Sequence, residues 1–129
     1  PSSVGKVVTF KIGGTGTIAD SELLPIDRTP KAESFGDETM IADGAVAFSR
    51  NCMVCHGALA ASSGVLPDLR WSAITGNPEA WKGVVIDGNL AANGMVSFAE
   101  FVTAEESEAI RAYVLAQAHA SADTTDDGQ

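Results

Sequence analysis

The residues of this chain that could do chemistry lie in one pentapeptide, Cys52-Met53-Val54-Cys55-His56. The spacing C-x-x-C-H is the attachment signature of covalently bound c-type haem. One turn of helix brings both thiols within reach of the two haem vinyl groups, across which they add. The imidazole that follows directly becomes the proximal ligand of the iron. The motif therefore predicts one covalent haem c per chain, held by Cys52, Cys55 and His56.

Other uses of paired cysteines fit the sequence less well. A redox-active C-x-x-C needs a preceding strand and a βα pattern, which the surrounding sequence lacks. A zinc site needs four ligands, and the chain offers only Cys52, Cys55, His56 and the distant His119. A structural disulfide between the two cysteines is also compatible with the sequence.

Length and charge bound the possible partners. The 129 residues correspond to one domain with an appendage. Residues 1–36 carry equal numbers of acidic and basic side chains, so the whole net charge of −9 lies in residues 37–129. That charge argues against nucleic acid and anionic membranes as partners. It fits either a partner with a positive docking face or a solvated acidic surface.

The expected compartment follows from the attachment chemistry. Thioether attachment of haem takes place on the outer side of the bacterial membrane, so we expect a periplasmic protein. The chain begins at Pro1 without a leader, and we expect a mature or excised piece of a protein that once carried a signal peptide. No run approaches the roughly eighteen apolar residues of a membrane span, so we expect a chain that does not cross the bilayer.

The N-terminal part, residues 1–36, reads as a strand followed by a linker. Val8, Phe10 and Ile12 alternate with polar or smaller side chains, which predicts a strand over Val4–Ile12. No partner strand is evident in the chain, so this strand must pair outside it or lie on the haem domain. Residues 15–36 lack any period and read as an extended linker.

The helix signals in the rest of the sequence predict an all-α domain over residues 37–120. Asp37 is a plausible N-cap for a helix over 38–51. Asn77 and Pro78 give a strong start signal for a second helix, which stops at Asp87-Gly88.

The last helix opens at Thr103, which has Glu106 at the spacing of a capping box. Its apolar stripe includes Ile110, Tyr113 and Val114. Residues 121–129 read as an acidic, flexible tail.

These elements resemble class I cytochromes c. Gly44, Phe48 and the C-x-x-C-H motif reproduce the spacing with which that family opens. The resemblance implies that the N-terminal and C-terminal helices cross near Gly44, against an aromatic side chain that Tyr113 supplies. It also implies that the carbonyl of Pro67 holds the Nδ1–H of His56, which fixes the tautomer and orientation of a ligand histidine.

A closer resemblance covers nearly the whole chain. The segments 64–72 and 94–98 look like the C-terminal haem domain of quinohaemoprotein alcohol dehydrogenases, which join a pyrroloquinoline-quinone (PQQ) β-propeller to a cytochrome c domain. Residues 5–14 resemble the end of such a propeller. The chain has nothing that could form the propeller or hold the quinone, so we expect no substrate chemistry on it.

The resemblance places the sixth iron ligand in a loop flanked by glycine. Met95 lies there, whereas Met53 is inside the haem-binding turn and Met40 is on the first helix. A thioether ligand raises the reduction potential. His119, at the end of the last helix, is expected to complement the helix dipole rather than to bind iron.

Further side chains are candidates for contact with the haem. Arg70 and Trp71 follow residues 65–69 around Pro67, here called the proline loop. Each can donate to a propionate, although a surface arginine beside a core tryptophan is equally compatible with the sequence. The expected apolar lining is Val54, Leu66, Leu69, Val96 and Phe98.

The resulting prediction is an electron-transfer module with His56 and Met95 as axial ligands. It would accept electrons from a PQQ-dependent dehydrogenase, tethered or separate, and pass them to a downstream periplasmic acceptor. The rival is a peroxidase-like haem enzyme or gas-binding protein with an open distal site, for which the sequence offers no distal histidine.

Overall fold

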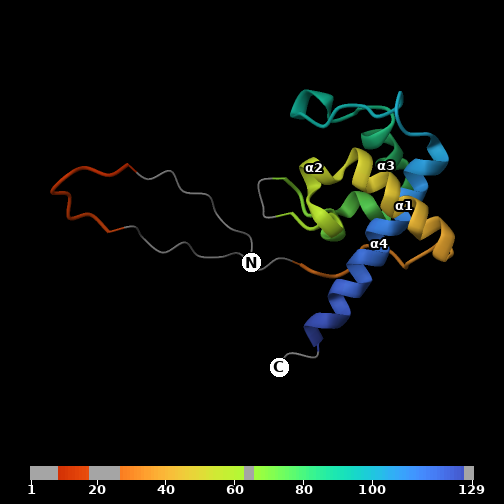
Figure 1. The fold of residues 1–129 in the computed structure, drawn as a ribbon, viewed down its shortest axis with the longest axis horizontal. Helices are drawn as coiled ribbons and strands as arrows, with labels where there is room; N and C mark the ends of the chain where they lie inside the picture. Colours follow the sequence, from red (N-terminus) through yellow and green to blue (C-terminus); the bar gives the residue numbers. More distant parts are fainter. Residues whose placement is uncertain (1–8, 18–26, 63–65, 127–129) are drawn as a thin grey trace.

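The computed structural model describes residues 9–17, 27–62 and 66–126 (Figure 1). Within these residues the chain is helical and contains no strand. The elements, in chain order, are α1 (Glu38–Asn51), α2 (Met53–His56), η1 (Ala58–Ala60), η2 (Leu69–Trp71), η3 (Ala73–Gly76), α3 (Pro78–Val85), η4 (Ala91–Asn93) and α4 (Ala104–Asp126), where η marks a 3₁₀ helix. None of these helices is long and apolar enough to span a bilayer.

The helices begin at the residues that the sequence predicted. The carboxylate of Asp37 accepts from the Met40 amide at 2.8 Å, and the side chain of Asn77 accepts from the Ala80 amide at 3.0 Å. At the start of α4, the Thr103 hydroxyl accepts from the Glu106 amide while the Glu106 carboxylate accepts from the Thr103 amide. This reciprocal capping box satisfies amides that lack a partner within the helix.

Helices α1 and α4 cross in direct backbone contact. A Cβ atom placed on Gly44 would lie 1.9 Å from the carbonyl oxygen of Ala109, so only glycine permits this approach. Beside the crossing, the rings of Phe48 and Tyr113 pack with their centroids 5.3 Å apart. The predicted crossing and its aromatic partner are thus confirmed.

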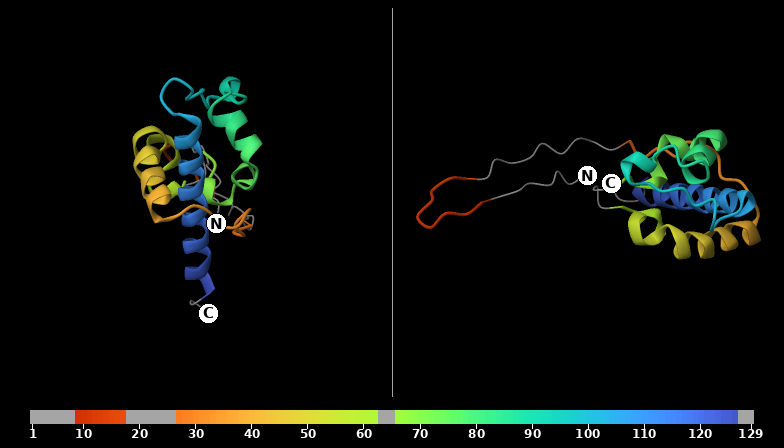
Figure 2. Two further views of the ribbon diagram at one scale, coloured as in Figure 1. Left: turned by 90° about the vertical axis from the view of Figure 1, so that its right-hand side faces the viewer. Right: turned by 90° about the horizontal axis from the view of Figure 1, so that it is seen from above.

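Helix α4 is the central element of the domain. In the left view of Figure 2, α1 (orange to yellow) and α3 (green) lie on opposite sides of α4 (blue). The middle of α4 is buried accordingly, including Ile110, Val114 and Leu115. On the α3 side, the indole N–H of the buried Trp81 donates to the carbonyl and hydroxyl oxygens of Ser107.

The prediction of a strand over Val4–Ile12 is wrong for the part that the structure describes. Residues 9–12 form no strand, and the side chains of Phe10 and Ile12 are 86% and 102% exposed. A turn closes here instead, with the Gly14 amide donating to the Lys11 carbonyl at 2.9 Å. A strand needs a partner for its backbone groups, and the described residues provide none. Residues 4–8 lie outside the described residues.

The last part of the predicted linker is packed on the helices. The imidazole Nε2 of His119 lies 2.9 Å from the carbonyl oxygen of Ala32. The Phe35 ring lies 4.3 Å from the guanidinium carbon of the buried Arg111. The carbonyl of Lys31 also sits directly over Gly76. Residues 27–36, here called the strap, therefore pack as part of the helical domain.

Two expectations for the C-terminal end change as well. Helix α4 continues to Asp126, so residues 121–126 of the predicted flexible tail are helical. His119 therefore lies within the helix rather than at its end. The His119 side chain contacts the strap, and the expected role of complementing the helix dipole does not account for this contact.

The strap leads to a stability prediction. Deleting residues 1–36 removes the contacts of Ala32 and Phe35 with α4, whereas deleting residues 1–26 keeps them. A lost hydrogen bond and a lost cation–π contact each cost on the order of 1 kcal/mol. We expect guanidinium denaturation, followed by circular dichroism, to show a lower midpoint for the chain that lacks residues 1–36. The chain that lacks only residues 1–26 should keep the wild-type midpoint. Equal midpoints for the two truncations would contradict a packed strap.

Candidate functional site

The two cysteines and the histidine share one helical turn. Helix α2 follows α1 almost without interruption, and the amides of Cys55 and His56 both donate to the carbonyl of Cys52, at 3.2 and 2.9 Å. The Cys52 thiol packs against the core, and Cys55 is exposed. No disulfide joins the two cysteines, so the structural disulfide that the sequence left open is not formed.

The environment of the thiols also disfavours the other two alternatives. Burial, and after it the nearby Cys55, raises the pKa of the Cys52 thiol to about 11. Redox-active pairs depend on a thiol with a lowered pKa. Among the described residues, no group of three or more histidine, cysteine or carboxylate side chains is arranged to hold a metal ion, which argues against a zinc site.

The proximal histidine is held as the resemblance implied. His56 is 8% exposed, and its Nδ1 lies 3.3 Å from the carbonyl oxygen of Pro67. With Nδ1 engaged in this contact, Nε2 is the nitrogen that can bind iron. Two thiols and one oriented imidazole on a single turn are the donor set that haem c requires, so the residues fit the group.

The proline loop is fixed by an ion pair that sequence reasoning missed. Asp68 caps η2 by accepting from the Arg70 amide, and its carboxylate also accepts from Nε and Nη2 of Arg70. The remaining Nη1 of Arg70 donates to the hydroxyl of Ser121 on α4 at 2.9 Å. An aspartate directly before a helical turn is a capping signal, so the sequence could have indicated the role of Asp68. No sequence pattern marks Ser121 as a partner of Arg70.

Arg70 and Trp71 lie together, with the guanidinium carbon 5.3 Å from the indole centroid. The carboxylate of Asp68 raises the pKa of Arg70, and both residues are partly buried. The contacts of Arg70 connect the proline loop to α4. Contact of Arg70 and Trp71 with a haem propionate stays a prediction.

The three methionines differ in their surroundings. Met95 is partly buried, packs against the core and donates its amide to the Leu90 carbonyl at 3.2 Å. The side chain of Met40 lies against Gly36, where an added Cβ would be 2.8 Å from the Met40 sulfur. Met53 is 42% exposed on α2. Packing thus accounts for Met40, and Met95 stands in the loop that follows α3.

The expected apolar lining divides into two groups. Leu69 is buried and Phe98 packs against the core. Val54, Leu66 and Val96 are 92%, 39% and 58% exposed on α2, in the loop before η2 and in the loop after α3, and their contact with the haem stays a prediction. Of the motif over residues 64–72, Gly64 and Val65 lie outside the described residues.

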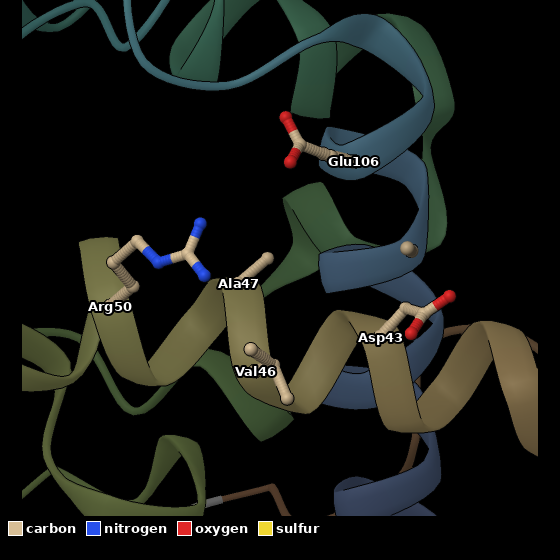
Figure 3. A pocket seen from close by; sticks show the side chains of 6 residues that line it. Asp43, Val46, Ala47, Arg50 and Glu106 are labelled. Atoms are coloured by element: carbon tan, nitrogen blue, oxygen red, sulfur yellow. The ribbon is translucent and has the colours of Figure 1, made fainter.

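A separate groove lies between α1 and the start of α4. Figure 3 shows Arg50 on α1 and Glu106 on α4 extending toward it, with Val46 and Ala47 nearby. None of the predicted haem-contacting residues lines this groove. It is therefore distinct from the site on α2.

The comparisons with known proteins agree with this geometry. The family model described as "Cytochrome C oxidase, cbb3-type, subunit III" matches residues 39–114, which include the C-x-x-C-H turn, the proline loop and Met95. The chain belongs to this family of cytochrome c domains. Its cofactor is therefore covalently bound haem c, and its class is that of an electron-transfer haem domain.

The chain is also similar to parts of much longer proteins. It is 36% identical to quinohemoprotein alcohol dehydrogenase ADH-IIG of Pseudomonas putida and 33% identical to the dehydrogenase subunit of a quinone alcohol dehydrogenase of Gluconobacter oxydans. These matches cover 88% and 92% of this chain but 16% of each relative. A solved structure of the Pseudomonas putida enzyme superposes with a TM-score of 0.66 at 34% identity, over 92% of this chain and 16% of that chain.

The attachment chemistry can be tested residue by residue. Acid–acetone extraction of the wild-type holoprotein should leave the colour with the protein. Replacing Cys52 or Cys55 singly by alanine should leave one thioether, so most haem should still resist extraction. The double variant should release it. Release of haem from the wild type would contradict covalent attachment.

Proposed function

We propose that this domain accepts one electron at a time from a PQQ-dependent dehydrogenase and passes it to a downstream periplasmic carrier. The observation that carries the proposal is the contact of His56 Nδ1 with the Pro67 carbonyl at 3.3 Å, on the same turn as both cysteines. It prepares an imidazole to bind iron in one fixed orientation. An iron site that hardly rearranges suits electron transfer.

The roles of the residues follow from their positions. Haem c supplies an iron that alternates between Fe(II) and Fe(III). Cys52 and Cys55 would anchor the group covalently, and His56 of α2 and Met95 in the loop after α3 would bind its iron. Core side chains such as Leu69 and Phe98 exclude water, which favours the less charged, reduced form.

The donor is assigned from the relatives. Their names describe quinohaemoprotein and quinone-dependent alcohol dehydrogenases, and the matching segment is a small part of each. We propose that the donor is the quinone-bearing part of such an enzyme, either tethered to this domain or separate from it, and that the oxidation of substrate takes place there. A periplasmic location fits both the haem attachment and the class of donor.

The assignment of Met95 has a direct test. Met95→Ala should abolish the thioether–Fe(III) charge-transfer band at the red end of the spectrum and lower the reduction potential, because a thioether stabilises Fe(II). Met40→Ala is the matched control, since packing against Gly36 accounts for that side chain. Loss of the band in the Met40 variant, with the band kept in the Met95 variant, would contradict the assignment.

The surface through which the donor would reach the haem can be tested by substituting two exposed valines, one in the haem-binding turn and one outside it. Val54 on α2 and Val46 on α1 are both well exposed, but only Val54 lies within the haem-binding turn. Anaerobic stopped-flow with a substrate-reduced PQQ-dependent alcohol dehydrogenase should reduce the wild-type haem. Val54→Glu should slow this about tenfold by placing a charge in the contact, and Val46→Glu should change it little. Reduction by ascorbate but not by the dehydrogenase would refute the donor.

A further inference from the structure

The loop of residues 86–97, here called the Met95 loop, is closed at its neck by two hydrogen bonds. The Phe98 amide donates to the Val85 carbonyl at 2.8 Å. Beside it, the Ser97 hydroxyl donates to the Ile86 carbonyl at 2.5 Å. Ile86 is the C-cap of α3, where carbonyls lack a donor within the helix. The Ser97 hydroxyl thus supplies a partner that the helix itself cannot.

Ser97 also fixes the chain on its other side. Its hydroxyl accepts from the Ala99 amide at 3.2 Å, so one side-chain oxygen joins the end of α3 to the start of the segment leading to α4. Gly88 packs directly against it, because an added Cβ would lie 3.0 Å from the Ser97 Cβ. With a φ of +72°, Gly88 is doubly unsuited to a larger residue.

The start of the loop is also held to α3. The Asn89 amide donates to the Gly83 carbonyl at 3.0 Å, and the Met95 amide donates to the Leu90 carbonyl at 3.2 Å. Lys82 and Asp87 also form an ion pair at 2.9 Å, which ties the start of the loop to α3. The hydrogen bonds that the structure gives residues 90–96 all stay within the loop, and most residues of the loop are exposed. Closure of the neck therefore limits how far Met95 can move.

We propose that Ser97 is a positioning residue that keeps Met95 in place by closing the neck of the loop. The inference rests on the proposed function, in which Met95 is the distal ligand. An external ligand can replace Met95 only when the loop opens. The apparent affinity of such a ligand for the ferric protein is then proportional to the open fraction. Loss of the Ser97 hydroxyl should raise that fraction.

Imidazole binding to the ferric holoprotein tests the proposal. The apparent dissociation constant, read from loss of the thioether–Fe(III) band, should fall about two- to tenfold in Ser97→Ala, as expected for one neutral hydrogen bond. Ser97→Thr, which keeps the hydroxyl, should bind imidazole more nearly as the wild type does. Ser49→Ala, on the exposed face of α1, should leave the affinity unchanged.

A second comparison separates positioning from general stability. Ser107→Ala removes a hydroxyl that accepts from Trp81 in the buried core, so it should lower the denaturation midpoint without tightening imidazole binding. Suppose that Met95→Ala shows Met95 to be the ligand, and that Ser97→Ala binds imidazole with the same affinity as the wild type. This result would overturn the role of Ser97 and leave the proposed function standing. If the band persists in Met95→Ala, the distal ligand of the proposed function fails instead.

Discussion

The contact between Gly44 and the Ala109 carbonyl sets the distance between α1 and α4, and the rest of the domain depends on it. An added Cβ would lie 1.9 Å from that oxygen, so any side chain there would force the two helices apart. Helix α1 leads into α2, and α4 packs against the other elements of the core. The crossing therefore fixes where the thiols and His56 stand relative to the core. Overpacking of this kind typically costs 1–3 kcal/mol, roughly, and displaces backbone.

His56 and Met95, the two iron ligands of the proposed function, are held in different ways. On the proximal side, His56 is buried and its contact is with the carbonyl of Pro67, whose loop is tied to α4 through Asp68, Arg70 and Ser121. Met95, the proposed second ligand, stands in an exposed loop whose neck is closed by hydrogen bonds of Ser97 and Phe98. If Met95 binds the iron, this looser support would make its thioether the more easily displaced ligand.

The strap ties the N-terminal segment to the same helix that organises the core. Phe35 stacks on Arg111, whose guanidinium also donates to the Thr75 carbonyl and pairs with Glu108. Arg111 is thus a buried cation shared by α4, η3 and the strap. Because Lys31, Ala32 and Phe35 contact the helices, the chain joins the domain at residue 31 rather than at residue 37. In a tethered dehydrogenase this anchoring would shorten the free linker and restrict the orientations of the haem domain.

The sequence by itself determined what depends on neighbours along the chain. The C-x-x-C-H turn, the caps at Asp37 and Asn77 and the capping box at Thr103 are local patterns. The crossing at Gly44 and the Pro67 contact followed from resemblance to a known spacing. Only the tertiary structure decided the contacts between distant segments. His119 meets Ala32 across 87 residues and Arg70 meets Ser121 across 51, and no local pattern marks either partner. Ser97 likewise acts through a carbonyl eleven residues away, which becomes its partner only once α3 ends beside the returning loop.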